Sequence, residues 1–175
     1  MCTLYPHTVG AAAFLISFVT AVLLPVSAPA QQQAPQFAIV SLDDSTKLIS
    51  TESLRGKTVL LDFWATWCPP CVEEIPELAR VYEKFKDHGF EIVSLSFDKS
   101  VAQVQRFRTR RHPMPWLHAL VERGFGDYIS DMFEVLNIPR QILLDPEGRI
   151  VAQDDELRGE RLESTVAKWV TKTEK

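Results

Sequence analysis

The sequence predicts one α/β domain with a central mixed β-sheet flanked by helices, and three observations predict it. The chain has 175 residues, 46% of them hydrophobic and 24% charged, which is typical of a single globular domain with a core. From Phe37 onward, short strand-like apolar runs alternate with longer runs of helical periodicity. Near the C-terminus, two strand-like runs flank a tight turn, which predicts an antiparallel hairpin beside parallel strands.

The first 30 residues form a separate compositional unit. All 19 basic and 23 acidic residues lie after residue 40, whereas residues 9–26 are almost continuously apolar. Ala28 and Ala30 follow at the spacing of a signal-peptidase cleavage site. We therefore expect a signal peptide over residues 1–30 and export of the protein. An uncleaved membrane anchor is the alternative, because about 18 apolar residues approach the length that spans a bilayer.

The domain itself is expected over residues 37–175, behind a polar, proline-containing tether at residues 31–36 that we expect to be mobile. Its strongest strand signal is Thr58–Trp64, which is nearly all apolar, as a central strand covered on both faces should be. Residues 71–86 then show apolar side chains at helical spacing. Gly89 follows this helix at the place of a left-handed C-cap.

The middle of the domain predicts a second strand and a second helix. Residues 90–97 read as another central strand, which forms a parallel βαβ unit with the first through the intervening helix. Residues 100–111 predict a helix that must end before the prolines at 113 and 115. Residues 116–120 are a candidate for a short strand.

The C-terminal part predicts a helix, a hairpin and a closing helix. Residues 126–136 are expected to be helical. Arg140–Leu144 and residues 149–153 flank the turn at residues 145–148 and predict the hairpin. Residues 160–172 show helical periodicity and close the domain.

Charge and cysteine count exclude two classes of protein. A net charge of −4 gives no electrostatic reason to expect nucleic acid as a partner. Three cysteines are too few for a disulfide-stapled secreted module, so a chemical role is favoured. Cys2 precedes the apolar segment and would be removed with it, which leaves two thiols in the mature chain.

Those two thiols, Cys68 and Cys71, lie between the strongest strand and the first helix. This spacing places Cys68 at the helix N-terminus, where free N–H groups and the helix dipole favour a thiolate and lower the thiol pKa. Cys68 is therefore the expected nucleophile. Cys71, one turn further on, can resolve the mixed disulfide that Cys68 forms with a partner.

Two other interpretations of the pair are weaker. Half of a zinc site would need a second pair, and the four histidines show no ligand-like spacing, so no metal is expected. A purely structural disulfide would close too small a loop to constrain the unfolded chain much. The expected redox group is the Cys68–Cys71 disulfide itself, with no separate cofactor.

The residues around the pair carry a family resemblance. The run LLDFWATWCPPC, ending at Cys71, resembles the thioredoxin-fold signature, and CVEEIP after it resembles the exported ResA/TlpA-like branch. The segment IPRQILLDPEGRI resembles the cis-proline hairpin of that family. The resemblance covers roughly residues 37–170. It implies a thioredoxin-like fold with an extra N-terminal hairpin and a central insertion, and a protein-disulfide oxidoreductase activity.

The resemblance also implies roles for two carboxylates. Asp62 lies on the otherwise apolar strand and matches the buried aspartate of thioredoxins, whose raised pKa suits proton transfer during exchange. The alternative is an aspartate on the solvent side of the strand. Glu74 lies one turn after Cys71 and matches the active-site glutamate of the ResA-like branch. A surface helix carboxylate is its alternative.

The expected substrate-binding rim comprises Trp67, Pro69, Pro70, Ile138 and Pro139. In the family, the bond between Ile138 and Pro139 is a cis peptide that faces the disulfide and binds an extended substrate segment. An ordinary trans proline is the alternative. The next residue departs from the common family pattern, which has threonine where this chain has Arg140. Its guanidinium could stabilise the thiolate, select acidic substrates or point into solvent.

The favoured function is an exported, monomeric thiol:disulfide oxidoreductase that reduces protein disulfides. Its expected partners are protein thiols and disulfides, with apocytochrome c as one candidate client, and an exported or membrane electron donor. The chain would contact the membrane only if residues 1–30 stay attached. A peroxiredoxin-like thiol peroxidase is disfavoured, because Thr66 lies two residues before Cys68 where that family needs three. A non-catalytic binding module of the same fold is the third alternative.

Overall fold

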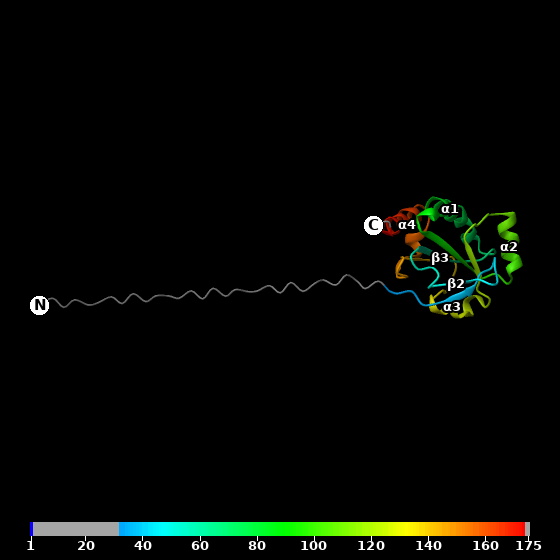
Figure 1. The fold of residues 1–175 in the computed structure, drawn as a ribbon, viewed down its shortest axis with the longest axis horizontal. Helices are drawn as coiled ribbons and strands as arrows, with labels where there is room; N and C mark the ends of the chain where they lie inside the picture. Colours follow the sequence, from blue (N-terminus) through cyan, green and yellow to red (C-terminus); the bar gives the residue numbers. More distant parts are fainter. Residues whose placement is uncertain (2–31, 174–175) are drawn as a thin grey trace. The chain divides into compact units, whose positions relative to one another are not determined.

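A five-stranded mixed sheet is the framework of the computed structural model, which describes Met1 and residues 32–173 (Figure 1). Strands β3, β4 and β5 are mutually parallel, β6 runs antiparallel to β3, and β7 runs antiparallel to β6. The order is β5-β4-β3-β6-β7, with β3 at Thr58–Trp64, β4 at Phe90–Ser96, β5 at Leu117–Leu120, β6 at Arg140–Leu144 and β7 at Ile150–Gln153. The predicted mixed sheet and its hairpin are confirmed.

The two central strands are nearly continuous apolar runs because helices or loops cover both of their faces. All seven residues of β3 are buried, and so are six of the seven in β4. Register places Asp62 opposite Ser94 on one side and opposite Gln141 on the other. Three polar side chains therefore lie next to one another on three neighbouring strands.

Helices cover both faces of the sheet. In Figure 1, α1 and α4 lie together on one side of it, whereas the β1–β2 hairpin and α3 lie on the other. The bounds are β1 at Ala38–Val40, β2 at Leu48–Ser50, α1 at Pro69–Phe85, α2 at Val101–Arg110, α3 at Tyr128–Met132 and α4 at Glu160–Thr173. The extra N-terminal hairpin is therefore confirmed, and its strands pair antiparallel. Residues 32–173 also contain three short 3-10 helices: η1 at Lys86–His88, η2 at Gly124–Gly126 and η3 at Asp154–Leu157.

Aromatic rings hold the hairpin side of the molecule to the sheet. The Phe63 ring of β3 lies 5.8 Å from that of Phe133 and 6.3 Å from that of Phe97, measured between centroids. Phe133 in turn contacts Phe37 edge to face at 5.7 Å. Such tilted and edge-on pairs add to the stabilisation from burial. Asp62 is adjacent to Phe63 in the strand, so its side chain lies on the opposite face of β3, which α1 covers.

Helix α1 starts two residues earlier than the sequence pattern predicts, because its first turn contains both prolines of the cysteine motif. Proline is well suited to the first helical positions, where no backbone N–H is needed. Ile75, Leu78 and Phe85 are buried against the sheet. Gly89 follows at φ 78°, which confirms the predicted left-handed turn.

The prediction of a helix over residues 126–136 is wrong for most of its length. Only Tyr128–Met132 is α-helical. Glu134 takes a left-handed φ of 52°, and the Val135 N–H donates to the Ser130 carbonyl, which closes the helix in a Schellman-type turn. This turn buries both Phe133 and Val135, and that burial explains why the helix stops early.

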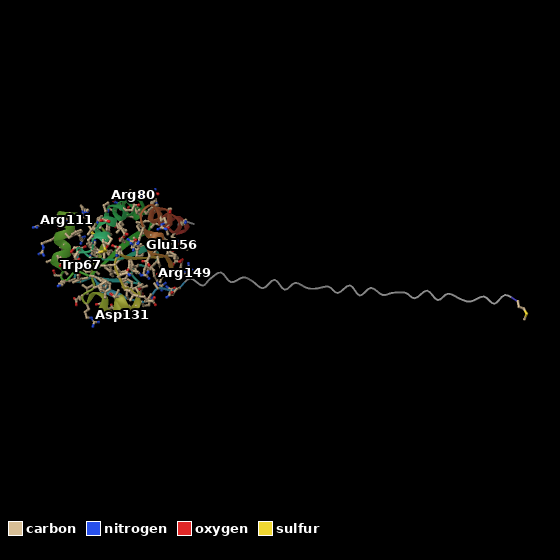
Figure 2. The ribbon with its side chains drawn as sticks, turned by 180° about the vertical axis from the view of Figure 1, so that it is seen from behind. Trp67, Arg80, Arg111, Asp131, Arg149 and Glu156 are labelled. Atoms are coloured by element: carbon tan, nitrogen blue, oxygen red, sulfur yellow. A yellow bond between two sulfur atoms is a disulfide. The ribbon has the colours of Figure 1, made fainter. Side chains whose placement is uncertain are left out.

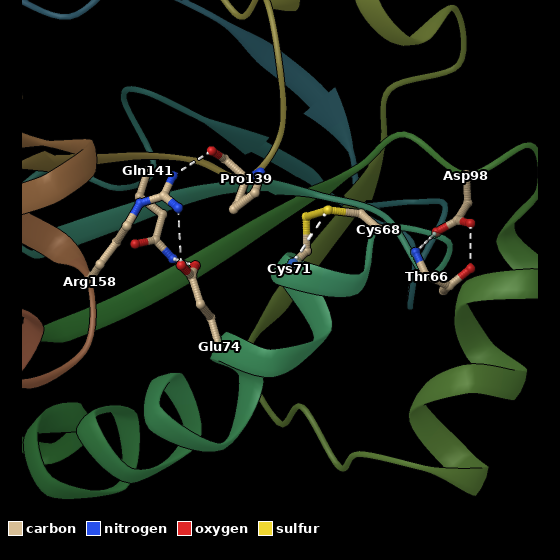
Figure 3. Close-up of a disulfide and its surroundings, with 8 residues drawn as sticks. All are labelled: Thr66, Cys68, Cys71, Glu74, Asp98, Pro139, Gln141 and Arg158. Carbon is tan, nitrogen blue, oxygen red and sulfur yellow. Dashed lines mark hydrogen bonds and ion pairs between the residues drawn. A yellow bond between two sulfur atoms is a disulfide. The ribbon is translucent and has the colours of Figure 1, made fainter.

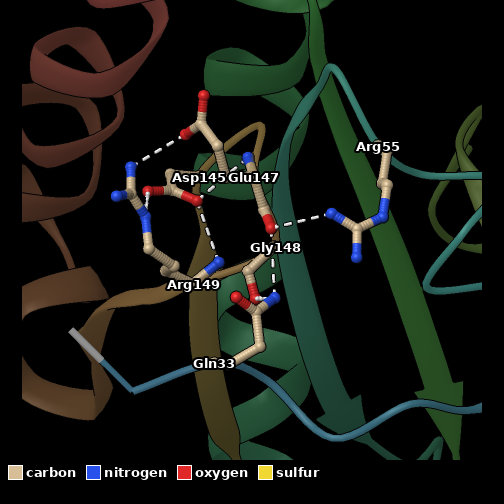
Figure 4. Close-up of polar contacts among 6 residues, drawn as sticks. All are labelled: Gln33, Arg55, Asp145, Glu147, Gly148 and Arg149. Atoms are coloured by element: carbon tan, nitrogen blue, oxygen red, sulfur yellow. Dashed lines mark hydrogen bonds and ion pairs between the residues drawn. The ribbon is translucent and has the colours of Figure 1, made fainter. Parts of the chain in front are cut away.

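The part of the predicted tether that the structure describes contacts the domain. The Gln33 side chain donates to the carbonyls of Glu147 and Gly148 at 3.0 and 2.8 Å (Figure 4). The Ala34 N–H donates to the same Gly148 carbonyl, and Ala34 is buried. Arg55 donates to the Glu147 carbonyl from the other side. This segment is therefore bound to the β6–β7 turn.

The predicted signal peptide or anchor lies, apart from Met1, outside the described residues. Within residues 32–173, no helix has both the length and the apolar character needed to cross a membrane.

Candidate redox site

A disulfide joins Cys68 and Cys71 at the start of α1. Cys68 is the N-cap residue, and its Sγ accepts a hydrogen bond from the Cys71 N–H at 3.3 Å. Both cysteines are buried, at 5% and 3% exposure. The first sulfur therefore lies where helix N–H groups and the positive end of the dipole stabilise a thiolate once the bond is reduced.

The loop that presents Cys68 is anchored by a buried carboxylate that sequence reasoning missed. Asp98 accepts hydrogen bonds from the Thr66 hydroxyl at 2.6 Å and from the Thr66 N–H at 3.0 Å (Figure 3). The Ser96 hydroxyl donates to the same carboxylate at 2.8 Å. Asp98 lies two residues after the end of β4, at the sheet edge where β3 leads into the cysteines. That position was a usable signal in the sequence.

Asp62 lies inside the protein, so the alternative of a solvent-facing aspartate is wrong. It is 3% exposed and accepts a 2.9 Å hydrogen bond from the Ser94 hydroxyl. Burial raises the pKa of Asp62 to about 7, and the nearby negative charge of Glu74 adds to the rise. Hydrogen bonds from Ser94 and Gln141 act in the opposite direction. A carboxyl group of this kind can gain or lose a proton near neutral pH.

Glu74 is not a plain surface carboxylate. It extends from α1 toward β6, where it accepts a 3.0 Å hydrogen bond from the Gln141 side-chain amide. Arg158, at the end of η3, forms an ion pair with it at 3.3 Å (Figure 3). Burial raises the pKa of Glu74, and the positive charge of Arg158 opposes that rise. The structure thus brings Glu74 close enough to Asp62 for its negative charge to raise the pKa of Asp62.

Gln141 and Arg158 were both missed by the sequence analysis. Gln141 lies only two residues after Pro139, but its amide meets a glutamate 67 positions earlier in the chain. Arg158 comes 84 positions after Glu74, in a segment with no recognisable motif. Neither residue gave a signal of its own, because each acts through a contact that only the fold creates.

The peptide bond between Ile138 and Pro139 is cis, as the family resemblance implied. In the view of Figure 3, Pro139 lies between the disulfide and Arg158. The Pro139 carbonyl accepts a 2.7 Å hydrogen bond from Nη2 of Arg158. The loop before β6 is thereby tied to the same side chain that binds Glu74.

Arg140 takes none of the three roles considered from the sequence. Its guanidinium pairs with Asp154 and donates to the Gln153 side chain at 2.7 Å. Both partners lie where β7 passes into η3. The side chain is 19% exposed and is committed to this structural contact.

The remaining predicted rim residues differ in exposure. Trp67 is 54% exposed, and Figure 2 shows it at the edge of the domain. Pro69 and Pro70 are exposed, Ile138 is half-buried and Pro139 is buried. Leu136, two residues before Ile138, is 87% exposed and was not predicted. An exposed apolar surface of this kind is suited to binding another polypeptide.

In the part of the chain that the structure describes, no cluster of three or more histidine, cysteine, aspartate or glutamate residues could hold a metal ion. The chemistry that this site supports is thiol–disulfide exchange, with the buried Asp62 on the strand before the sulfur pair and the half-buried Glu74 on the helix after it.

Comparison with known proteins also indicates thiol–disulfide exchange. A model of thioredoxin-like proteins matches residues 56–150, more than half of the chain. The thiol-disulfide oxidoreductase ResA of Bacillus subtilis is 34% identical over 118 residues, which cover 67% of this chain and 63% of that protein. ResA of Bacillus anthracis is 33% identical over 122 residues, covering 70% and 67%.

Solved structures are also similar. The thioredoxin domain of a thiol-disulfide oxidoreductase from Bacteroides vulgatus has a TM-score of 0.70 at 32% identity, covering 82% of this chain and 99% of that one. A thiol:disulfide interchange protein from Bacteroides sp. has a TM-score of 0.68 at 32% identity, covering 81% and 90%.

Proposed function

The chain belongs to the ResA-like family of thioredoxin-fold thiol-disulfide oxidoreductases, and from this membership we propose that it is an exported reductant of disulfides in other proteins. The observation that carries the proposal is the Cys68–Cys71 disulfide at the N-terminus of α1, with Asp62 buried on β3 and Glu74 half-buried on α1. Thiol–disulfide exchange requires a stabilised thiolate, a second sulfur to resolve the mixed disulfide and a proton acceptor.

The proposed reaction starts from the reduced pair. The Cys68 thiolate attacks one sulfur of a client disulfide, the client S–S bond breaks, and the other client sulfur leaves as a thiolate that takes a proton from water. Cys71 then loses its proton to the Asp62 carboxylate and attacks Sγ of Cys68. The mixed disulfide breaks, and the second client sulfur leaves as a thiolate that takes up that proton from Asp62. Two electrons pass to the client, and the Cys68–Cys71 disulfide forms.

Asp62 supports the second step because its pKa of about 7 lets it accept a proton near neutral pH and release it again. Glu74 contributes by its charge, which makes the Asp62 carboxylate a stronger base.

The client is proposed to dock on Trp67, Pro69, Pro70 and the loop at Ile138–Pro139. Exposure of Trp67 supports this, because an aromatic ring beside a reactive disulfide is a common anchor for a partner chain. Apocytochrome c thiols are one candidate client. An exported or membrane protein is proposed to return electrons to the pair, and the protein is proposed to act as a monomer.

Export is proposed from the apolar run at residues 9–26 and the small residues at 28–30. Cleavage after residue 30 would release a mature chain with two cysteines. Fractionation of cells expressing the full chain, with N-terminal sequencing of the product, tests both the location and the cleavage.

Reduction of insulin disulfides tests the activity. Wild type, Cys68→Ser and Cys71→Ser would be compared with dithiothreitol as the electron donor. We expect wild type to exceed the dithiothreitol background and both variants to fall to it. Equal rates for wild type and Cys68→Ser would leave only a binding role. Consumption of hydrogen peroxide much faster than by a free thiol would favour a peroxidase.

A further inference from the structure

Two parts of the site that the proposed function uses separately are joined by one side chain, Arg158. Its Nη2 donates to the Pro139 carbonyl at 2.7 Å, and its Nη1 pairs with Glu74 at 3.3 Å (Figure 3). Pro139 belongs to the loop proposed to bind the client, whereas Glu74 belongs to the helix that carries the cysteines. Arg158 itself comes from neither element, because it follows η3.

We propose that Arg158 is a positioning residue for disulfide exchange, which holds the client-binding loop at Pro139 in a fixed place relative to the Glu74 carboxylate. This inference rests on the proposed function and deepens it. Arg158 need not touch the client or the sulfurs, because it acts through the two groups that it joins.

Arginine is the side chain that fits this task. Its planar guanidinium presents separate N–H donors in a rigid arrangement, so two acceptors in different directions are held at once. The side chain is 31% exposed, so the two contacts are partly shielded from water. The backbone around it is also fixed, since Gly159 at φ 54° turns the chain into α4 directly after it.

The charges around Glu74 also support the proposal. The charged groups around Glu74 are Asp62 on β3, Glu77 on its own helix and Arg158, while Gln141 on β6 supplies a neutral amide. Glu77 is already paired with Arg80. Arg158 is therefore the cation that favours ionised Glu74, and the same charge lowers the pKa of Asp62 as well.

Three variants test the inference: Arg158→Gln, Arg158→Lys and the control Arg80→Gln. Arg80 also pairs with two glutamates, but it lies on the outer side of α1, apart from Trp67 (Figure 2). Steady-state kinetics with a disulfide-bonded peptide would give KM and kcat. Carbon-13 NMR of the oxidised proteins would follow the titration of Glu74, and this readout needs no activity.

We expect Arg158→Gln to raise KM about fivefold, the effect of one lost hydrogen bond, and to move the Glu74 titration to higher pH. Arg158→Lys should restore the titration but not KM, because a single ammonium cannot reach both acceptors. Arg80→Gln should change neither. Thermal unfolding of each variant would verify that it is folded. If Arg158→Gln is not folded, the KM of Arg158→Lys tests the inference instead.

Two results would overturn the inference. One is a KM and a Glu74 titration in Arg158→Gln that match those of Arg80→Gln. The other is full recovery of KM in Arg158→Lys, which would show that charge alone matters. An inactive wild type would instead contradict the proposed function, so the two failures are distinguishable.

Discussion

The buried amide of Gln141 donates a 3.0 Å hydrogen bond to the Glu74 carboxylate and stands in register beside Asp62 on the neighbouring strand. Ser94 donates to Asp62 from the other side, and the Trp116 indole donates to Ser94 at 2.9 Å. A single polar row therefore runs under α1 across β6, β3 and β4. Because its members are hydrogen-bonded in a buried environment, a change in the charge of one carboxylate should shift the pKa of the other.

Replacing Asp62 with asparagine should slow disulfide exchange. The amide cannot take the Cys71 proton, so we expect a loss of at least about tenfold in insulin reduction at pH 7. In wild type, the rate of the resolving step should rise as pH passes through about 7, where Asp62 ionises. Stopped-flow kinetics over about 3 pH units centred on about pH 7 would measure the rate of the resolving step. An Asp62→Asn profile that overlays wild type would remove Asp62 from the mechanism.

The same substitution should change how stability depends on pH. The folded-state pKa of Asp62 is raised from 3.8 to about 7, so the folded protein binds a proton that the unfolded chain has released. Wild type should therefore lose stability as pH rises from about 4 to about 7, by up to about 4 kcal/mol relative to Asp62→Asn. Urea unfolding of both oxidised proteins at several pH values checks this. Parallel pH profiles would contradict it.

Glu74→Gln should lower the pH at which Asp62 titrates. The negative charge of Glu74 raises the pKa of Asp62, and glutamine removes that charge while keeping the shape of the side chain. Carbon-13 NMR of the Asp62 carboxyl group gives the measurement. Glu77→Gln, one turn further along α1, is the matched control and should leave the Asp62 titration unchanged. An unshifted midpoint in Glu74→Gln would show that the two acids are uncoupled.

Asp98→Asn should destabilise the loop that presents Cys68. Thr66 donates both its hydroxyl and its N–H to this carboxylate, and an asparagine amide would turn a donor toward at least one of these groups. We expect a loss of about 2–3 kcal/mol in the free energy of unfolding, as for other broken buried networks. Asp131→Asn is the control, because Asp131 is exposed (Figure 2) and should change stability by less than about 0.5 kcal/mol. Urea denaturation of both variants distinguishes these outcomes.

Cys71→Ser should trap the client. Without a resolving thiol, the mixed disulfide formed by Cys68 cannot be released, so a covalent adduct should accumulate on Cys68. Mass spectrometry after incubation with a disulfide-bonded peptide would locate it. Cys68→Ser should give little adduct under the same conditions. An adduct that forms mainly on Cys71 in Cys68→Ser would reverse the assignment of nucleophile and resolving thiol.

The elements that the sequence predicted best are those whose pattern is set by burial alone. Thr58–Trp64 matches its predicted strand because a run of seven nearly apolar residues is typical of a central strand that is buried on both faces. The helix predicted to residue 136 fails because Phe133 and Val135 are drawn into the core by contacts that lie far away in sequence.

The site shows the same division. Cys68 and Cys71 are recognisable from their motif and from their place between strand and helix. Arg158 is not, because its importance comes from a partner 84 positions away, whereas Asp98 could have been noticed from its place shortly after a central strand. Arg140 was a misleading candidate for a related reason. Its position after Pro139 suggested a role in the site, but its guanidinium forms an ion pair with Asp154, which the sequence did not indicate.

The reduction potential of the Cys68–Cys71 couple tests the central claim most directly. Equilibration of the purified protein with defined ratios of reduced and oxidised dithiothreitol or glutathione, followed by thiol alkylation and mass spectrometry, gives the value. A reductant of protein disulfides should have a potential near about −270 mV, as thioredoxin does. A value near about −120 mV would mark an oxidant and would contradict the proposed direction of electron flow.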